Sequence, residues 1–261
     1  MKSYKMINHS NRLDNIKNII LVSSGKGGVG KSTVTFNLAK KLQQQGLKMA
    51  VLDADIYGPS FPTLLSKENY KVEVEQDNFT PLTINDIQFM SFGFLIDPNK
   101  AAVWRGAIVV KAIKQMLYDT AWHKDIDILL IDMPPGTGDI HLSILQHFPI
   151  TAYIMVTTAH SLSLSDVKRS VEMYKKFNLT CLGFIQNMAY YLCRKCNNKD
   201  YIFGKNSVLP LLEVEYSLYN LGDIPLNSNI DDLFDYYDNI ATKVLSQLRS
   251  CSRASIAIIS N

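Results

Sequence analysis

A glycine-rich segment near the start of the chain limits what this sequence can fold into more than any other feature. Residues 25–32 read Gly-Lys-Gly-Gly-Val-Gly-Lys-Ser and satisfy the phosphate-loop pattern G-x-x-x-x-G-K-S/T. Such a loop needs a strand before it and a helix after it. The sequence offers a β-branched run at Ile19–Val22 and, at 32–45, apolar residues at a spacing of four. The residues expected to bind the nucleotide here are Gly25, Lys26, Gly27, Gly28, Val29, Gly30, Lys31, Ser32 and Thr33.

We expect the two lysines of this loop to have different roles. Lys31 is expected to reach the β- and γ-phosphates, and the hydroxyl of Ser32 is expected to bind Mg²⁺. An ordinary phosphate loop needs one lysine, whereas this loop has a second one, Lys26. Lys26 is either a solvated surface lysine or a second positive charge for the phosphates. In the second case it is supplied across a dimer interface, as an arginine finger is.

The rest of the chain repeats the alternation of apolar runs and helical patterns. This order predicts an α/β fold with a mostly parallel, twisted sheet covered by helices on both faces. Residues 66–100 break the rhythm, and their alternating stretches at 70–74 and 87–90 predict an inserted hairpin or edge strand. We expect a loose arm over 1–17, one domain over 18–250 and a tail over 251–261. The expected strands are 49–52, 126–131, 151–156 and 182–185, and the expected helices 109–117, 166–177 and 231–248.

Charge and hydropathy exclude some classes of partner. The net charge of +3 gives no argument for binding nucleic acid or a membrane surface. The sequence contains no run of 18 apolar residues, and its first residues do not resemble a secretory signal. We therefore expect a cytosolic protein without stable membrane association, in which the four cysteines are thiols or metal ligands rather than disulfides.

Aspartates at the ends of two apolar runs are candidates for metal binding and hydrolysis. Asp132 follows the run 126–131, where a carboxylate beside the phosphate loop would complete the Mg²⁺ site; the alternative is an aspartate that caps a turn. Asp53 and Asp55 follow the run 49–52. We expect Asp55, at the start of a loop, to orient the attacking water. Asp53 is expected to be structural, or linked to Mg²⁺ through water.

Two of the four cysteines form a C-x-x-C pair at Cys193 and Cys196. The adjacent Arg194 and Lys195 are expected to lower the thiol pKa values and to favour the thiolates. Two thiolates do not complete a zinc or iron–sulfur site, but two copies of the pair in a symmetric dimer would supply four ligands. From spacing alone, an iron–sulfur cluster, a zinc site and a redox dithiol or unreactive pair remain open.

Taken together, these motifs resemble one family. Residues 25–33 resemble the deviant Walker A motif of ParA/MinD-type ATPases, in which Lys26 is the signature lysine. The remaining segments resemble the Mrp/ApbC branch of iron–sulfur carriers, and they occur in the family's order over about residues 19–230. These segments are Asp53–Ser60 (DADIYGPS), Val103–Gly106 (VWRG), Asp132–Asp139 (DMPPGTGD), Gln186–Met188 (QNM) and the cysteine pair followed by Ile202–Gly204 (IFG).

The resemblance implies a slow, homodimeric cytosolic ATPase and assigns roles in nucleotide binding. Lys26 would contact phosphate across the dimer, while Lys31 and Ser32 would hold phosphate and Mg²⁺. Asp55 matches the switch I aspartate and Asp132 the Walker B aspartate, both near Mg²⁺. For the base, the resemblance implies an adenine-recognising Asn187 and a base-binding loop that contains Pro225.

The resemblance also implies the cargo. A 4Fe–4S cluster would bridge two subunits through Cys193 and Cys196, arrive from scaffold proteins and pass to apo-proteins. The chain departs from the family pattern at Ala107, Ala159-His160, Gln186 and Arg194, and none of these departures removes a ligand. Two alternatives are a ParA/MinD-like switch that acts on DNA or membrane, and a zinc-stabilised nucleotide-binding regulator. The first needs a basic patch or a basic amphipathic helix, and residues 250–261 contain one arginine.

Overall fold

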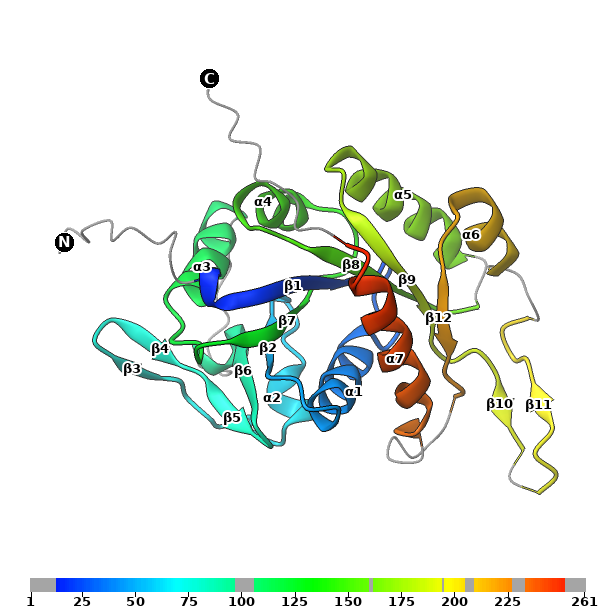
Figure 1. Ribbon diagram of the computed structural model, residues 1–261, viewed down its shortest axis with the longest axis horizontal. Helices are drawn as coiled ribbons and strands as arrows, with labels where there is room; N and C mark the ends of the chain where they lie inside the picture. The colour runs from blue at the N-terminus through cyan, green and yellow to red at the C-terminus, as the bar shows by residue number, and fades with distance from the viewer. Residues whose placement is uncertain are drawn as a thin grey trace.

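Eight strands form the central sheet, in the order β12-β9-β8-β1-β7-β2-β6-β5 (Figure 1). The computed structural model describes residues 13–96, 106–159, 162–193, 195–204, 209–226 and 233–251. Every neighbouring pair in the sheet is parallel except β5 and β6, which are antiparallel. The strands are β1 (Ile16–Ser23), β2 (Met49–Asp53), β5 (Leu82–Ile84), β6 (Ile87–Ser91), β7 (Ile126–Asp132), β8 (Ala152–Thr157), β9 (Thr180–Gln186) and β12 (Asn220–Asp223).

Helices cover both faces of this sheet and separate two apolar layers. One layer packs α1 and α7 on the sheet, with α2 beside α1, and the other packs α3, α4, α5 and α6 on the opposite face (Figure 1). Because both faces are covered, β2 and β8 are buried at every residue, as parallel strands between helices should be. The helices are α1 (Lys31–Gln44), α2 (Phe61–Leu64), α3 (Gly106–Tyr118), α4 (Asp139–His147), α5 (Leu162–Lys176), α6 (Leu209–Tyr216) and α7 (Tyr236–Leu248).

The predicted α/β class and every predicted helix and strand outside 66–100 are confirmed, with shifts at their ends. The stretch 87–90 belongs to a hairpin, the first of the two predicted alternatives, because β6 pairs antiparallel with β5 across the turn at Asn85 and Asp86. Strand β6 lies inside the sheet between β2 and β5 and is buried at every residue, so β5 is the edge strand. A second hairpin precedes β5 and overlaps the other predicted stretch, 70–74: β3 (Glu73–Glu75) pairs with β4 (Asn78–Thr80).

The expected arm over 1–17 overlaps the first strand of the sheet by two residues. Strand β1 begins at Ile16, two residues ahead of the expected boundary at 18, and Ile16 is fully buried. Helix α7 ends at Leu248. Some predictions concern residues that the structure does not describe. These are most of the arm and the tail (1–12 and 252–261) and five motif residues: Val103, Trp104, Arg105, His160 and Arg194.

The parallel arrangement brings the carboxyl ends of the middle strands to one edge. In the register of the sheet, Asp132 at the end of β7 lies beside Val22 of β1 and Asp53 of β2. Farther along the same edge, Thr157 at the end of β8 lies beside Gln186 at the end of β9. The segments that follow these strands therefore gather along the edge where open α/β sheets bind their ligands.

A short hairpin projects beyond edge strand β12. It consists of β10 (Tyr191–Leu192) and β11 (Lys199–Asp200), which pair in antiparallel fashion, and Figure 1 shows it at the side of the molecule, outside the helical layers. The hairpin is tied to the segment after β12, because Leu226 donates its N–H to the carbonyl of Tyr190 at 2.7 Å. The cysteine pair lies between its two strands.

Candidate functional site

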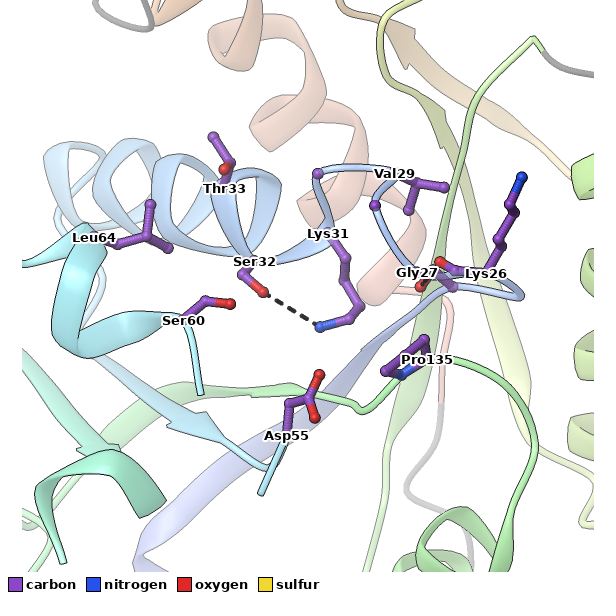
Figure 2. Close-up of a pocket in the computed structure, with 13 residues that line it drawn as sticks. Lys26, Gly27, Val29, Lys31, Ser32, Thr33, Asp55, Ser60, Leu64 and Pro135 are labelled. Carbon is purple, nitrogen blue, oxygen red and sulfur yellow. Dashed lines mark hydrogen bonds between the residues drawn. The ribbon is translucent and has the colours of Figure 1, made fainter. Parts of the chain in front are cut away.

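The phosphate loop joins β1 to α1 and lines a cavity at the carboxyl edge of the sheet. Gly30 precedes the first residue of α1 with a φ of 79°, and the N–H of Val34 closes the first turn on its carbonyl at 3.0 Å. The positive end of the helix dipole is thus directed at the loop, which favours an anion there. The cavity is lined by Ser24, Lys26, Gly27, Gly28, Val29, Gly30, Lys31, Ser32, Thr33, Asp55, Ser60, Leu64 and Pro135 (Figure 2).

Asp132, at the end of β7, joins three side chains at the start of α1 in one polar cluster. Its carboxylate lies 2.7 Å from Nζ of Lys31 and accepts hydrogen bonds from Oγ of Ser32 at 2.6 Å and Oγ1 of Thr35 at 2.7 Å. Asp132 is fully buried and Lys31 nearly so. Sequence reasoning missed Thr35, although it lies three residues after Ser32 and therefore on the same side of the helix.

The oxygen donors at this point fit a magnesium ion. The Ser32 hydroxyl and the Asp132 carboxylate are already in contact, and hard oxygen ligands of this kind are what Mg²⁺ prefers. Lys31 and Ser32 both bond to Asp132, so the two side chains expected to meet phosphate and Mg²⁺ lie together between the loop and β7. The structure thus brings together Lys31, Ser32 and Asp132, as the sequence predicted.

Asp53 anchors the loop that follows β2. One carboxylate oxygen accepts hydrogen bonds from the N–H of Ser60 at 3.1 Å and of Phe61 at 3.3 Å, and from Oγ of Ser91 at 2.9 Å. The other accepts from the N–H of Asp55 at 3.1 Å. Both ends of the loop 55–60 are therefore held by one side chain, which favours the structural alternative for Asp53.

Burial of Asp53 has a consequence for stability. Removal from water, with the nearby charge of Asp132, raises the pKa of Asp53 from 3.8 to about 7. The folded state therefore binds a proton that the unfolded state has released between about pH 4 and 7. We expect the free energy of unfolding of the ligand-free protein to fall with rising pH in this range, by up to about 1.4 kcal/mol per pH unit. Asp53→Asn should flatten the slope in urea titrations, and an unchanged slope would contradict the assignment.

Asp55 lies on the wall of the same cavity as the phosphate loop. Figure 2 shows its carboxylate directed toward the Lys31 ammonium. One oxygen accepts the N–H of Gly58 at 3.3 Å. Partial burial raises the pKa of Asp55, with Lys31 opposing the rise. Asp55 therefore differs from Asp53, because its carboxylate faces the cavity and holds only the near end of its own loop.

Lys26 lines the cavity but is directed away from the other lysine. In Figure 2 its side chain extends from the loop on the side opposite to the Lys31 ammonium. Its backbone is fixed, because Oγ of Ser24 donates a hydrogen bond to the carbonyl of Lys26 at 3.0 Å. The phosphate loop thus presents one lysine to its own cavity and one outward.

Gly25 lies against the backbone of α5. A Cβ atom at Gly25 would be 2.4 Å from the carbonyl carbon of Asp166 and 2.6 Å from the nitrogen of Val167, whereas at Gly27 the nearest atom would be 3.9 Å away. We expect Gly25→Ala to lower the free energy of unfolding by about 1–3 kcal/mol, because backbone cannot move as a side chain can. Gly27→Ala is the matched control and should stay within about 0.5 kcal/mol of wild type in thermal or urea unfolding. Equal unfolding of both variants would disprove this contact.

The residues expected at the nucleotide base lie on adjoining segments beyond the cavity lining. Asn187 follows β9, and its Nδ2 donates a hydrogen bond to the carbonyl of Val29 at 2.8 Å. Pro225 is buried in the segment after β12, which is joined to the first segment by the N–H of Ala189 on the carbonyl of Ile224 at 2.9 Å. The structure places Asn187 against the phosphate loop, a contact that the sequence did not reveal.

The cysteine pair sits in the turn of the projecting hairpin. The N–H of Asn197 donates to the carbonyl of Cys193 at 2.8 Å, and the N–H of Cys193 donates to the carbonyl of Asn198 at 3.0 Å. Hydrogen bonds from the backbone of Lys195 and of Cys196, and then from the Cys196 thiol, lower the pKa of Cys193. For Cys193 the pKa is lowered as predicted, but the first causes are backbone donors rather than the charge of Lys195.

One subunit does not complete a metal centre at these thiols. Cys193 is half-buried and Cys196 is exposed, so both sulfur atoms are near the surface. Among the described residues, no cluster of three or more His, Cys, Asp or Glu side chains could hold a metal ion. Within the same part of the chain, no helix is both long and apolar enough to cross a membrane.

Comparison with known proteins agrees with this combination of features. The ParA-group family model for the NUBPL iron-transfer P-loop NTPase matches residues 15–258. The iron–sulfur cluster carrier protein of Escherichia coli K12 is 40% identical over 232 residues, which are 88% of this chain and 62% of that protein. The chain therefore spans less than two thirds of that relative's length.

Two further matches cover more of their own length. The iron–sulfur cluster transfer protein NUBPL of Mus musculus is 36% identical over 256 residues, 91% of this chain and 80% of that protein. A nucleotide-binding protein of Archaeoglobus fulgidus, whose structure was determined in complex with ADP, superposes with a TM-score of 0.74 at 35% identity. That match covers 89% of this chain and 91% of the other.

Proposed function

The chain belongs to the family of NUBPL iron-transfer P-loop NTPases, and on that premise we propose that it is an ATP-hydrolysing carrier of a 4Fe–4S cluster. The observation that carries the proposal is the presence, in one chain, of a phosphate site and a pair of free thiols near the surface. Lys31, Ser32 and Asp132 form the first, and Cys193 and Cys196 form the second.

In the nucleotide half of the proposal, each residue has a definite task. Lys31 leaves Asp132 for the β- and γ-phosphates, and the loop amides bind phosphate oxygens. Ser32 and Asp132 hold Mg²⁺, which when bound neutralises the phosphate charge. Asp55 orients the water that attacks the γ-phosphate, and Asp53 keeps the loop of Asp55 in place.

In the cargo half of the proposal, the cluster is a substrate held between two subunits. Cys193 and Cys196 of each copy supply two thiolates, and the dimer supplies the four that such a cluster needs. Transfer to an apo-protein exchanges these thiolates for those of the recipient and moves no electrons. Scaffold proteins would deliver the cluster by the same exchange in reverse.

The experiment that tests this proposal is metal and sulfide analysis after anaerobic purification or reconstitution. We expect about four iron and four sulfide per dimer, and transfer to an apo-ferredoxin that depends on ATP. Zinc without sulfide would instead support a zinc-stabilised regulator. Absence of both metals after reconstitution would refute the carrier. A DNA- or membrane-positioning switch has no use for the thiol pair, and the same measurement separates it from the carrier.

Lys26 is proposed to act on the nucleotide of the partner subunit, because its side chain extends away from the Lys31 ammonium of its own cavity. Lys26→Ala should keep ATP binding but lower hydrolysis by about 10³-fold, the low end for a charge supplied in trans. ATP-dependent dimerisation, followed by light scattering with a non-hydrolysable analogue, should weaken as well. Lys17→Ala, at the other end of β1 with an exposed side chain, is the control. Normal dimerisation and turnover of Lys26→Ala would show that Lys26 is only a solvated surface lysine.

A further inference from the structure

Asn187 is held from both sides in a fixed position beside the phosphate loop. Its backbone N–H donates to the carbonyl of Thr157, at the end of the neighbouring strand β8, at 2.8 Å. Its side-chain Nδ2 donates to the carbonyl of Val29 at 2.8 Å, and the residue is 8% exposed. The amide therefore links the end of the sheet to the last turn of the loop, before α1 begins.

The contact between Asn187 and the phosphate loop is so close that residue 30 of the loop must be a glycine. A Cβ atom at Gly30 would lie 2.3 Å from Nδ2 of Asn187 and 3.7 Å from the terminal methyl carbon of Met188. Gly30 also has a φ of 79°, a region that residues with a Cβ rarely adopt. The absence of a side chain at Gly30 thus lets the Asn187 amide lie directly on the loop backbone.

Fixing the Val29 carbonyl also fixes an amide that phosphate needs. The peptide unit is planar and trans, so the carbonyl of Val29 and the N–H of Gly30 point in opposite directions. With the carbonyl held by Asn187, the N–H of Gly30 must point away from Asn187. Phosphate loops bind anions through successive amides of this kind, and their affinity depends on how those amides are oriented before the anion arrives.

We propose that Asn187 is a positioning residue for the polyphosphate, which orients the Val29–Gly30 peptide whether or not a base is bound. This inference rests on the proposed ATP binding and adds to it a role that is independent of adenine. If Asn187 contacted only the base, its loss would not change the affinity for a polyphosphate that has no base. If Asn187 orients the loop, its loss would lower that affinity. Inorganic tripolyphosphate is such a ligand.

The test compares ATP and inorganic tripolyphosphate, both with Mg²⁺, on wild type, Asn187→Ala and Asn187→Leu. Leucine has a similar branched shape and keeps the packing if alanine weakens the fold. We expect both variants to lose affinity for both ligands by about ten-fold, because the buried Val29 carbonyl is left without its donor. Calorimetry measures ATP binding, and competition with ATP measures tripolyphosphate binding.

The control and the opposing outcomes are distinct. Gln88→Ala removes another buried amide, whose Oε1 accepts the N–H of His123 at 2.8 Å far from the loop, and should leave both affinities unchanged. Loss of ATP affinity with unchanged tripolyphosphate affinity would overturn the inference and leave Asn187 as an adenine contact. Unchanged affinity for both ligands would overturn both roles. If wild type bound neither ligand, the proposed function itself would fail.

Discussion

Cys193→Ala should remove the cluster from the protein while leaving ATP binding unchanged. A dimer of this variant keeps only two of the four thiolates, one Cys196 from each subunit, and a 4Fe–4S cluster needs four ligands. The brown colour and the absorbance at about 400 nm should therefore be lost after anaerobic reconstitution. Iron and sulfide should fall to background, and Cys196→Ala should behave in the same way. Nucleotide affinity should persist because the hairpin lies outside the phosphate loop.

The remaining cysteines provide the matched control. Burial raises the pKa of the Cys181 thiol to about 12, so this sulfur stays protonated and is a poor metal ligand at neutral pH. Burial also raises the pKa of Cys251. Alanine at either position should leave the iron and sulfide content at the wild-type level. A full cluster load in the Cys193→Ala, Cys196→Ala double variant would show that the cluster site lies elsewhere.

Lys31→Ala should lower the affinity for ATP by about 10- to 100-fold. The ammonium group makes charge-assisted hydrogen bonds to phosphate oxygens in the proposed complex, and each such bond is worth about 1.5–3 kcal/mol. The loop amides and the helix dipole remain, so residual binding is expected. Calorimetric titration with ATP and Mg²⁺ measures the effect directly.

A second buried lysine on the same helix controls for the loss of stability. Both Lys31 and Lys41 are 6% exposed and both pair with an aspartate, Lys31 with Asp132 and Lys41 with Asp238 at 2.9 Å. Lys41→Ala removes an equally buried ammonium ten residues after Lys31, although its partner Asp238 is exposed and Asp132 is not. It should lower the melting temperature without changing ATP affinity. Equal ATP affinity of Lys31→Ala and wild type would exclude Lys31 from the phosphate site.

Much of the fold could be predicted because it is encoded locally. The phosphate loop requires a strand and a helix around it, and β1 and α1 are where the pattern predicts them. Runs of apolar residues without alternation indicate strands buried on both faces, and β2, β7 and β8 are such strands. The hairpin that contains β6 was predicted, but the edge-strand alternative fails, because β6 also pairs with β2 and so lies inside the sheet.

The parts of the site that could not be predicted depend on contacts between distant segments. The bond from Asn187 to Val29 joins residues 158 positions apart, and the bond from Ser91 to Asp53 joins residues 38 apart. No local spacing rule reports such contacts. The lowered pKa of Cys193 was predicted from the neighbouring basic residues, but it comes from backbone donors whose direction depends on the turn. Residue type and motif were sufficient to predict that Lys31, Ser32 and Asp132 lie together.

The form of the projecting hairpin has a consequence for how the sequence of this chain can evolve. Residues 191–200 leave and re-enter the protein through a single antiparallel pair, with Tyr191 opposite Asp200 and Leu192 opposite Lys199. Paired residues in such a ribbon lie about 5 Å apart, so the entry and the exit of this segment coincide. Its length and ligands can diverge, or be exchanged for those of another hairpin, without altering the path of the sheet. The metal chemistry proposed for the hairpin and the nucleotide chemistry proposed for the phosphate loop would therefore be separable modules within one continuous chain.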